Sequence, residues 1–233
     1  MVGFNFNFYP CGNRNMVDIS KDLNSKRFLF TYLVIIGFLL VLLMNRLPLM
    51  HEDLRDIPSD MLSYLESPPR PLPSFSLLNN EQQELTQDWF IDKWSFVYFT
   101  HGNCHSSCKP ALTAMKDLQA GFANKDFQFL VIGIDGENET AENLATILNS
   151  QQFHFDVAAT DSPDLLEDIA RRFIALFLKT KFSNDQYMIE QEHHIFVVDP
   201  KGRVYATFRS LDDAAELKSK FLKMRYFYAR SES

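Results

Sequence analysis

The chain has 233 residues, of which 46% are hydrophobic and 14% aromatic, enough apolar material for one domain of ordinary size and an additional apolar segment. A formal net charge of -7 argues against a nucleic-acid partner, because neutralising phosphates requires clustered Lys and Arg. Three cysteines are too few for a disulfide-stabilised scaffold. The totals therefore predict a single folded domain that does not bind nucleic acid.

An uncharged apolar run occupies residues 28–44, with Lys26 and Arg27 before it and Arg46 after it. The run is long enough to span a bilayer, and we predict a transmembrane helix over residues 28–48. A signal peptide is the rival interpretation, but small residues for cleavage do not follow the run. Basic residues are more numerous before the run than after it, which predicts an N-terminus in the cytoplasm.

This orientation divides the chain into a cytoplasmic tail (residues 1–27), the anchor, an acidic and then proline-rich linker (residues 49–72), and a folded domain (residues 73–233). An Arg-rich, acid-poor leader is missing, which favours a bacterial inner membrane over mitochondrial import. The folded domain would then lie in the periplasm, a compartment that permits disulfides.

Within the domain, apolar runs alternate with helical patterns. We predict strands over residues 75–78, 94–100, 127–135, 155–160, 195–198 and 204–208, and helices over residues 107–122, 140–149 and 163–178 and from Ser210 to about Tyr226. Thr140 and Ser162 are the expected N-caps of the second and third helices. This order predicts an α/β sandwich with a mixed central sheet, as in a thioredoxin-like domain, preceded by the transmembrane helix.

Cys104 and Cys108 follow the strand over residues 94–100 and precede a helix, so they are expected at the carboxyl end of the sheet, where functional groups gather. Residues four apart share one face of a helix, and two convergent sulfurs form either a chelate or a disulfide. The first turn of a helix lowers the pKa of a nearby thiol, which favours both uses. The alternative is a pair of buried cysteines that only fill space.

The spacing of the cysteines separates two chemistries. Thioredoxin-type reductases place two residues between their cysteines and carry a facing cis-proline, whereas this chain has three intervening residues and no such proline. That arrangement leaves room for a third ligand. Two thiolates and an imidazole suit Cu(I) better than Mg or Ca, and zinc is the other candidate. The acidic run at residues 135–140 lacks the oxygen spacing of a calcium site and is interpreted as a helix start.

At this point the chain resembles the Sco/SenC family of membrane-anchored copper chaperones, which help to assemble the copper A centre of cytochrome c oxidase. The resemblance covers about residues 72–210 and rests on four segments: residues 73–77, the strand at residues 94–98 with Cys104 and Cys108 after it, residues 131–148, and residues 187–202. It implies a Cu(I) chaperone that passes its metal to an oxidase subunit or another copper or thiol client. It implies no turnover of a small substrate.

One departure from the family pattern concerns the third ligand. Gln191 stands where the family has its histidine, and a glutamine would bind Cu(I) poorly. His193 lies on the same side of the chain as Gln191 if the segment is extended, so we predict Cys104, Cys108 and His193 as metal ligands, with His194 as second choice. The histidine pair could also be a partly exposed strand start. Gln191 favours the alternative function, a membrane-tethered thiol-disulfide oxidoreductase in which Cys104 and Cys108 are the redox pair.

Overall fold

The computed structural model describes residues 26–46, 57–122, 126–182, 186–209 and 213–232. The chain divides into two compact units, residues 1–52 and residues 53–233. The described part of the first unit is the helix α1 (Lys26–Arg46). Within the described ranges, no helix is both long and apolar enough to cross a membrane. The transmembrane role of residues 28–48 stays a prediction, and the predicted tail lies outside the described residues up to residue 25.

The second unit is built on an eight-stranded sheet with the strand order β1-β10-β9-β4-β5-β6-β2-β3. Its strands are β1 (Leu65–Pro71), β2 (Ser76–Asn79), β3 (Glu84–Thr86), β4 (Trp94–Thr100), β5 (Phe127–Gly133), β6 (Asp156–Ala159), β9 (His194–Val198) and β10 (Arg203–Arg209). The central strands β4, β5 and β6 are parallel, and β9, β10, β1, β2 and β3 pair antiparallel with their neighbours. The predicted α/β fold with a mixed central sheet is confirmed.

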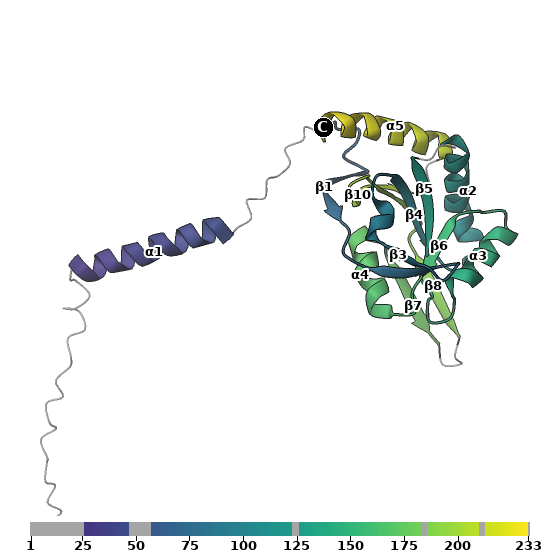
Figure 1. Cartoon of the computed structure of the whole chain (residues 1–233), viewed down its shortest axis with the longest axis horizontal. Coiled ribbons are helices and arrows are strands. Elements are labelled where there is room, and N and C mark those ends of the chain that lie inside the picture. The colour runs from purple at the N-terminus through teal and green to yellow at the C-terminus, as the bar shows by residue number, and fades with distance from the viewer. Residues whose placement is uncertain (1–25, 47–56, 123–125, 183–185, 210–212, 233) are drawn as a thin grey trace, which may run out of the picture. The chain divides into compact units, whose positions relative to one another are not determined.

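Helices cover both faces of the sheet. They are η1 (Gln87–Phe90), α2 (His105–Gly121), α3 (Ala141–Ser150), α4 (Pro163–Phe173) and α5 (Ala214–Ser231). Apolar residues of α2, α3 and α5 pack with one face of the sheet, and those of η1 and α4 pack with the other. Figure 1 shows α4 on the opposite side of the strands from α2 and α3. The strands β4 and β5 are buried at every residue, because both of their faces are covered.

Two predicted helix starts are confirmed by their caps. The Asn143 amide donates to Thr140 Oγ1 at 3.2 Å, and the Leu165 amide donates to Ser162 Oγ at 3.4 Å. A side-chain oxygen at the N-cap satisfies an amide that has no partner within the helix. The helices α3 and α4 therefore begin where these hydroxyls stand in the sequence.

Two helix predictions were wrong in their boundaries. The third helix ends at Phe173 and not near Leu178, because Ile174 adopts a left-handed conformation (φ 57°) that closes α4. The apolar residues that follow form β7 (Phe177–Lys181), which pairs with β8 (Tyr187–Gln191) in a separate two-stranded hairpin. The last helix is capped by Asp213, whose carboxylate accepts from the Glu216 amide at 2.8 Å. The predicted cap Ser210 lies outside the described residues.

The second half of the predicted linker differs from expectation, because residues 65–71 form the strand β1. This strand pairs antiparallel with β10, and Leu65 is buried at its start. Three of its residues are prolines, which cannot donate to a sheet ladder. The strand tolerates them because it lies at the edge of the sheet, where one side of the backbone needs no partner. A proline-rich segment is therefore part of the folded unit.

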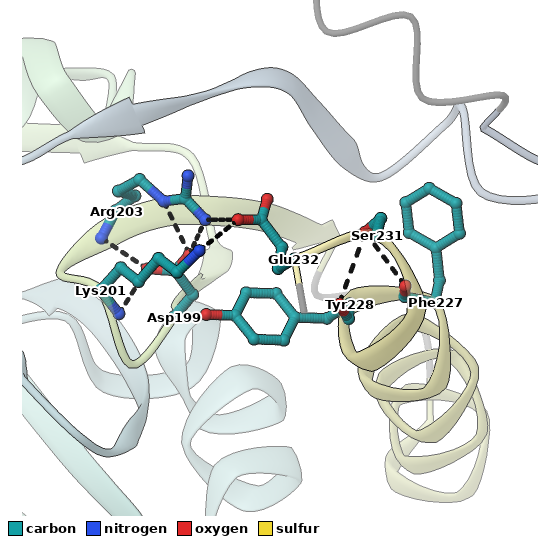
Figure 2. Close-up of polar contacts among 7 residues, drawn as sticks. All are labelled: Asp199, Lys201, Arg203, Phe227, Tyr228, Ser231 and Glu232. Atoms are coloured by element: carbon teal, nitrogen blue, oxygen red, sulfur yellow. Dashed lines mark hydrogen bonds and ion pairs between the residues drawn. The ribbon is translucent and has the colours of Figure 1, made fainter.

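The carboxyl end of α5 is tied to the turn between β9 and β10 by charged groups (Figure 2). Asp199 is fully buried and accepts from the Arg203 guanidinium at 2.6 and 2.8 Å. Glu232 lies 3.0 Å from Arg203 and 2.6 Å from Lys201. These contacts hold the last turn of α5 against the sheet, since a buried carboxylate requires a charged partner.

Candidate metal centre

The two cysteines lie where β4 gives way to α2. Cys104 is the N-cap residue of α2, and Cys108 lies in the first turn, with its amide donating to the Cys104 carbonyl at 3.2 Å. Their Cα atoms are 5.7 Å apart and their sulfurs form a disulfide. Both residues are buried. The spacing of four residues on a helix start thus brings the sulfurs together, as expected from the sequence.

The register of the sheet places His193 beside the cysteines. Ile195 of β9 pairs with Tyr98 of β4 in antiparallel register. Because residues two apart lie on the same side, the residue two before Ile195 lies next to Thr100, close to the start of α2. His193 Nδ1 is 3.8 Å from Cys108 Sγ. The ligand atoms of Cys104, Cys108 and His193 all lie within 4.8 Å of one another.

The two neighbouring candidates for the third ligand are placed differently. His194 lies outside the group formed by the cysteines and His193; its Nδ1 is 3.5 Å from a Glu192 carboxylate oxygen. Gln191 is half-buried, and its Nε2 donates to the Phe99 carbonyl at 2.7 Å. Of the histidine pair, His193 is the one beside the sulfurs. Its role as a metal ligand remains a prediction.

Two side chains of β4 that the sequence did not indicate also contact the group. The Tyr98 hydroxyl is 2.8 Å from His193 Nδ1, and Thr100 Oγ1 is 3.0 Å from Cys108 Sγ. Strand periodicity was the signal that could have found them. Residues 98 and 100 share one side of a strand that ends just before the first cysteine.

The sequence profile of the SCO1/SenC family matches residues 65–225. The chain belongs to the SCO1/SenC family. It is 22% identical over 131 residues to Protein SCO1 homolog 1, mitochondrial, of Arabidopsis thaliana, a match over 54% of this chain and 39% of the relative. A second Arabidopsis thaliana relative, Protein SCO1 homolog 2, mitochondrial, is 20% identical over 152 residues, 64% of this chain and 55% of that protein. The chain thus spans about half the length, or less, of these relatives.

Solved SCO structures share the fold. Arabidopsis thaliana ScoI with copper bound superposes with a TM-score of 0.57 at 18% identity, over 67% of this chain and 98% of that one. The described fold with its mixed central sheet is therefore the thioredoxin-like fold of this family. At 18% identity, this similarity shows a shared fold.

In this SCO1/SenC chain, burial decides the protonation states of His193 and Tyr98. Burial lowers the pKa of His193, and the neighbouring His194 lowers it further. Burial also raises the pKa of the Tyr98 hydroxyl well above its usual value, against a smaller lowering by Thr100. At neutral pH the imidazole is therefore neutral and the phenol keeps its proton. A neutral imidazole has the free lone pair that a metal ligand needs.

The loop before the first cysteine of this SCO1/SenC chain is held by a carboxylate. The Gly102 amide donates to both oxygens of Glu139, at 3.1 and 2.9 Å. A Cβ at position 102 would collide with the same carboxylate, so glycine permits this close approach. Burial raises the pKa of Glu139, against the lowering by the Gly102 hydrogen bond. The contact ties the cysteine loop to the start of α3.

The hairpin that leads to His193 is attached to the domain through Asp135, two residues after the end of β5. Its carboxylate is buried and accepts from Lys179 of β7 at 2.8 Å and from the Tyr187 hydroxyl of β8. A hollow of about 770 Å³ is lined in part by Asp135 and Lys179, and none of the three grouped residues lines it. The acidic run predicted as a helix start therefore also fixes the position of the hairpin.

Proposed function

We propose that this chain is a membrane-anchored Cu(I) chaperone that delivers copper for assembly of the copper A centre of cytochrome c oxidase. The observation that carries the proposal is the meeting of Cys104, Cys108 and His193, with their ligand atoms within 4.8 Å of one another. Two soft sulfurs and one imidazole are the donor set that suits Cu(I). Copper is cargo here, and zinc is the competing metal.

Loading begins with reduction of the disulfide. A dithiol reductant attacks one sulfur through its thiolate, forms a mixed disulfide, and resolves it with its second thiol. The reductant leaves as a disulfide, and Cys104 and Cys108 gain two electrons and two protons. Each cysteine then loses its proton as the thiolate binds Cu(I). His193 contributes a neutral lone pair and loses no proton, consistent with its lowered pKa.

The partner is proposed from the chemistry and from the family. BsSco, one of the structural neighbours, is described as a member of the Sco family of cytochrome c oxidase assembly proteins and as having a disulfide switch; it superposes with a TM-score of 0.55 at 18% identity, over 67% of this chain and 94% of that one. By analogy, a cytochrome c oxidase subunit or another copper or thiol client would take the copper by ligand exchange. The thiols of this client replace the chain's ligands one at a time, so copper is never released into water.

Residues 28–48 are proposed to anchor the chain in a bacterial inner membrane, with the N-terminus in the cytoplasm and the domain in the periplasm. Apolar side chains of α1, such as Leu33 and Phe38, are exposed, as expected for a surface that faces lipid. A disulfide such as that between Cys104 and Cys108 is stable in the oxidising periplasm. The predicted boundaries of the tail and the anchor belong to the same proposal.

The test is a Cu(I) competition titration of the reduced full-length chain in detergent. We expect one tightly held copper per chain. Cys104→Ser, Cys108→Ser and His193→Ala should each weaken binding by more than about 100-fold, beyond the cost of losing an outer partner of a metal ligand. His194→Ala is the matched control and should leave the affinity unchanged. Equal affinities of His193→Ala and the wild type would contradict the proposed ligand set.

A thiol-disulfide oxidoreductase is the second candidate, and the disulfide between Cys104 and Cys108 is the observation that favours it. In this case one cysteine attacks the disulfide of a partner, and the other resolves the mixed disulfide. Catalysed reduction of insulin by the reduced chain, without retention of copper in the titration, would select this function.

A further inference from the structure

Gln191 carries a polar atom that the proposed copper site leaves unexplained. Its Nε2 donates to the Phe99 carbonyl at 2.7 Å and approaches the Tyr98 hydroxyl at 3.4 Å, the long end of the range for a hydrogen bond. Its Oε1 is buried and accepts no hydrogen bond from the described residues. A buried oxygen without a donor costs free energy, and a donor that reached it would remove that cost.

Metal binding by His193 forces a change at Tyr98. If His193 binds through Nδ1, the Tyr98 hydroxyl loses the nitrogen that now lies 2.8 Å away. If His193 binds through Nε2, the ring proton must sit on Nδ1 and point at the Tyr98 oxygen. In both cases the Tyr98 hydroxyl cannot donate to His193, so its proton needs another acceptor.

Two acceptors stand near that hydroxyl. Thr100 is one: its Oγ1 lies 3.0 Å from Cys108 Sγ, and if its proton goes to the thiolate of the copper form, its oxygen keeps lone pairs that can accept from Tyr98. Gln191 is the other, and its Oε1 belongs to the amide whose nitrogen is already 3.4 Å from the Tyr98 oxygen. The glutamine oxygen has no other donor to satisfy.

We propose that Gln191 Oε1 accepts a hydrogen bond from the Tyr98 hydroxyl when His193 binds copper. Tyr98 and Gln191 are then positioning residues for the metal ligand. The inference rests on the proposed function and extends it. Gln191, at the position where the family pattern has a histidine, would then act through Tyr98 and would not itself bind the metal. The change requires rotation of the side-chain amide, which exchanges the Nε2 hydrogen bond to the Phe99 carbonyl for the one that Oε1 accepts from Tyr98.

The experiment is a double-mutant cycle on the reduced full-length chain in detergent, with Tyr98→Phe, Gln191→Met and the double variant. Cu(I) affinity is measured by competition titration. We expect each single change to weaken binding about tenfold, the lower end of the cost of losing an outer partner of a metal ligand. The double variant should bind Cu(I) only about tenfold more weakly than the wild type, because both changes remove the same hydrogen bond.

The same cycle on the disulfide form, read as thermal unfolding, should show a smaller coupling than the copper form, because the Tyr98–Gln191 contact there is long. Tyr64→Phe is the matched control, because the buried Tyr64 hydroxyl has no hydrogen-bond partner among the described residues. This change should leave the copper affinity unaltered.

The outcomes separate the inference from the proposed function. Independent, additive effects of the two changes, or no effect of Gln191→Met on copper affinity, overturn the role of Gln191 while the chaperone stands. A wild-type chain that holds no Cu(I) overturns both.

Discussion

The Nδ1 atom of His193 lies between two groups, 2.8 Å from the Tyr98 hydroxyl and 3.8 Å from the Cys108 sulfur. In the proposed copper site, the hydroxyl would orient the ring and the sulfur would share the metal with it, so the contacts that place the imidazole would also prepare it for binding. Its lowered pKa keeps it neutral at pH 7. At the scale of single residues, the imidazole of the proposed site is therefore already in place while the cysteines form a disulfide.

Asp135 gives a prediction about pH. Burial alone would raise the pKa of this carboxyl, but hydrogen bonds from Lys179, Tyr187 and Asn138 outweigh burial and lower it. Its charged form therefore stabilises the fold at neutral pH, and this stability is lost as the pH falls through the lowered folded pKa, below its ordinary value near 3.8. Asp135→Asn should lower the free energy of unfolding at pH 7 by about 2 kcal/mol.

The measurement is chemical denaturation of both proteins between pH 7 and pH 2. We expect the wild type to lose stability over the acid range more steeply than Asp135→Asn. Glu137→Gln, which removes an exposed partner of Lys179, is the control for the loss of charge. Parallel pH profiles for the wild type and Asp135→Asn would show that this carboxylate does not carry the effect.

At the scale of elements, the end of α4 gives the next prediction. Ile174 is a β-branched residue in the left-handed region, where its side chain is strained, and it is half-exposed. Ile174→Gly should remove this strain and stabilise the fold by about 0.5 kcal/mol after allowing for the greater freedom of glycine in the unfolded chain. Ile147→Gly, within α3, should instead destabilise by about 1 kcal/mol. A lower melting temperature for Ile174→Gly would refute the strain argument.

The elements also show what sequence patterns can and cannot predict. The strand at residues 94–100 and the caps Thr140 and Ser162 were predictable because each signal is local: an apolar run, or a hydroxyl before a helix. The end of α4 was not, since residues 174–178 continue the apolar pattern and only the backbone turn at Ile174 separates helix from strand. The strand β1 was missed because its prolines are acceptable only at an edge, which depends on the rest of the sheet.

The candidate site divides in the same way. Helical spacing alone brings Cys104 and Cys108 together, and strand alternation predicted that His193, two residues after Gln191, faces the same side. The contact of Tyr98 with His193 depends on the register between β4 and β9, which no local pattern contains.

At the scale of the whole molecule, the proposed anchor predicts how the chain fractionates. Full-length protein expressed in a bacterium should remain with the inner membrane after alkaline extraction, and removal of residues 28–48 should release it, because the hydrophobic run is the proposed lipid contact. Protease added to spheroplasts should digest the domain, which is expected outside the cytoplasm. Resistance of the domain in intact spheroplasts would reverse the proposed orientation.

The central claim, that two sulfurs and one imidazole of this chain share a copper ion, is tested most directly by X-ray absorption spectroscopy of the Cu(I)-loaded full-length chain. We predict two sulfur ligands and one nitrogen ligand per copper, and loss of the nitrogen in His193→Ala but not in His194→Ala. A wild-type spectrum without nitrogen, or one that His193→Ala leaves unchanged, would contradict it.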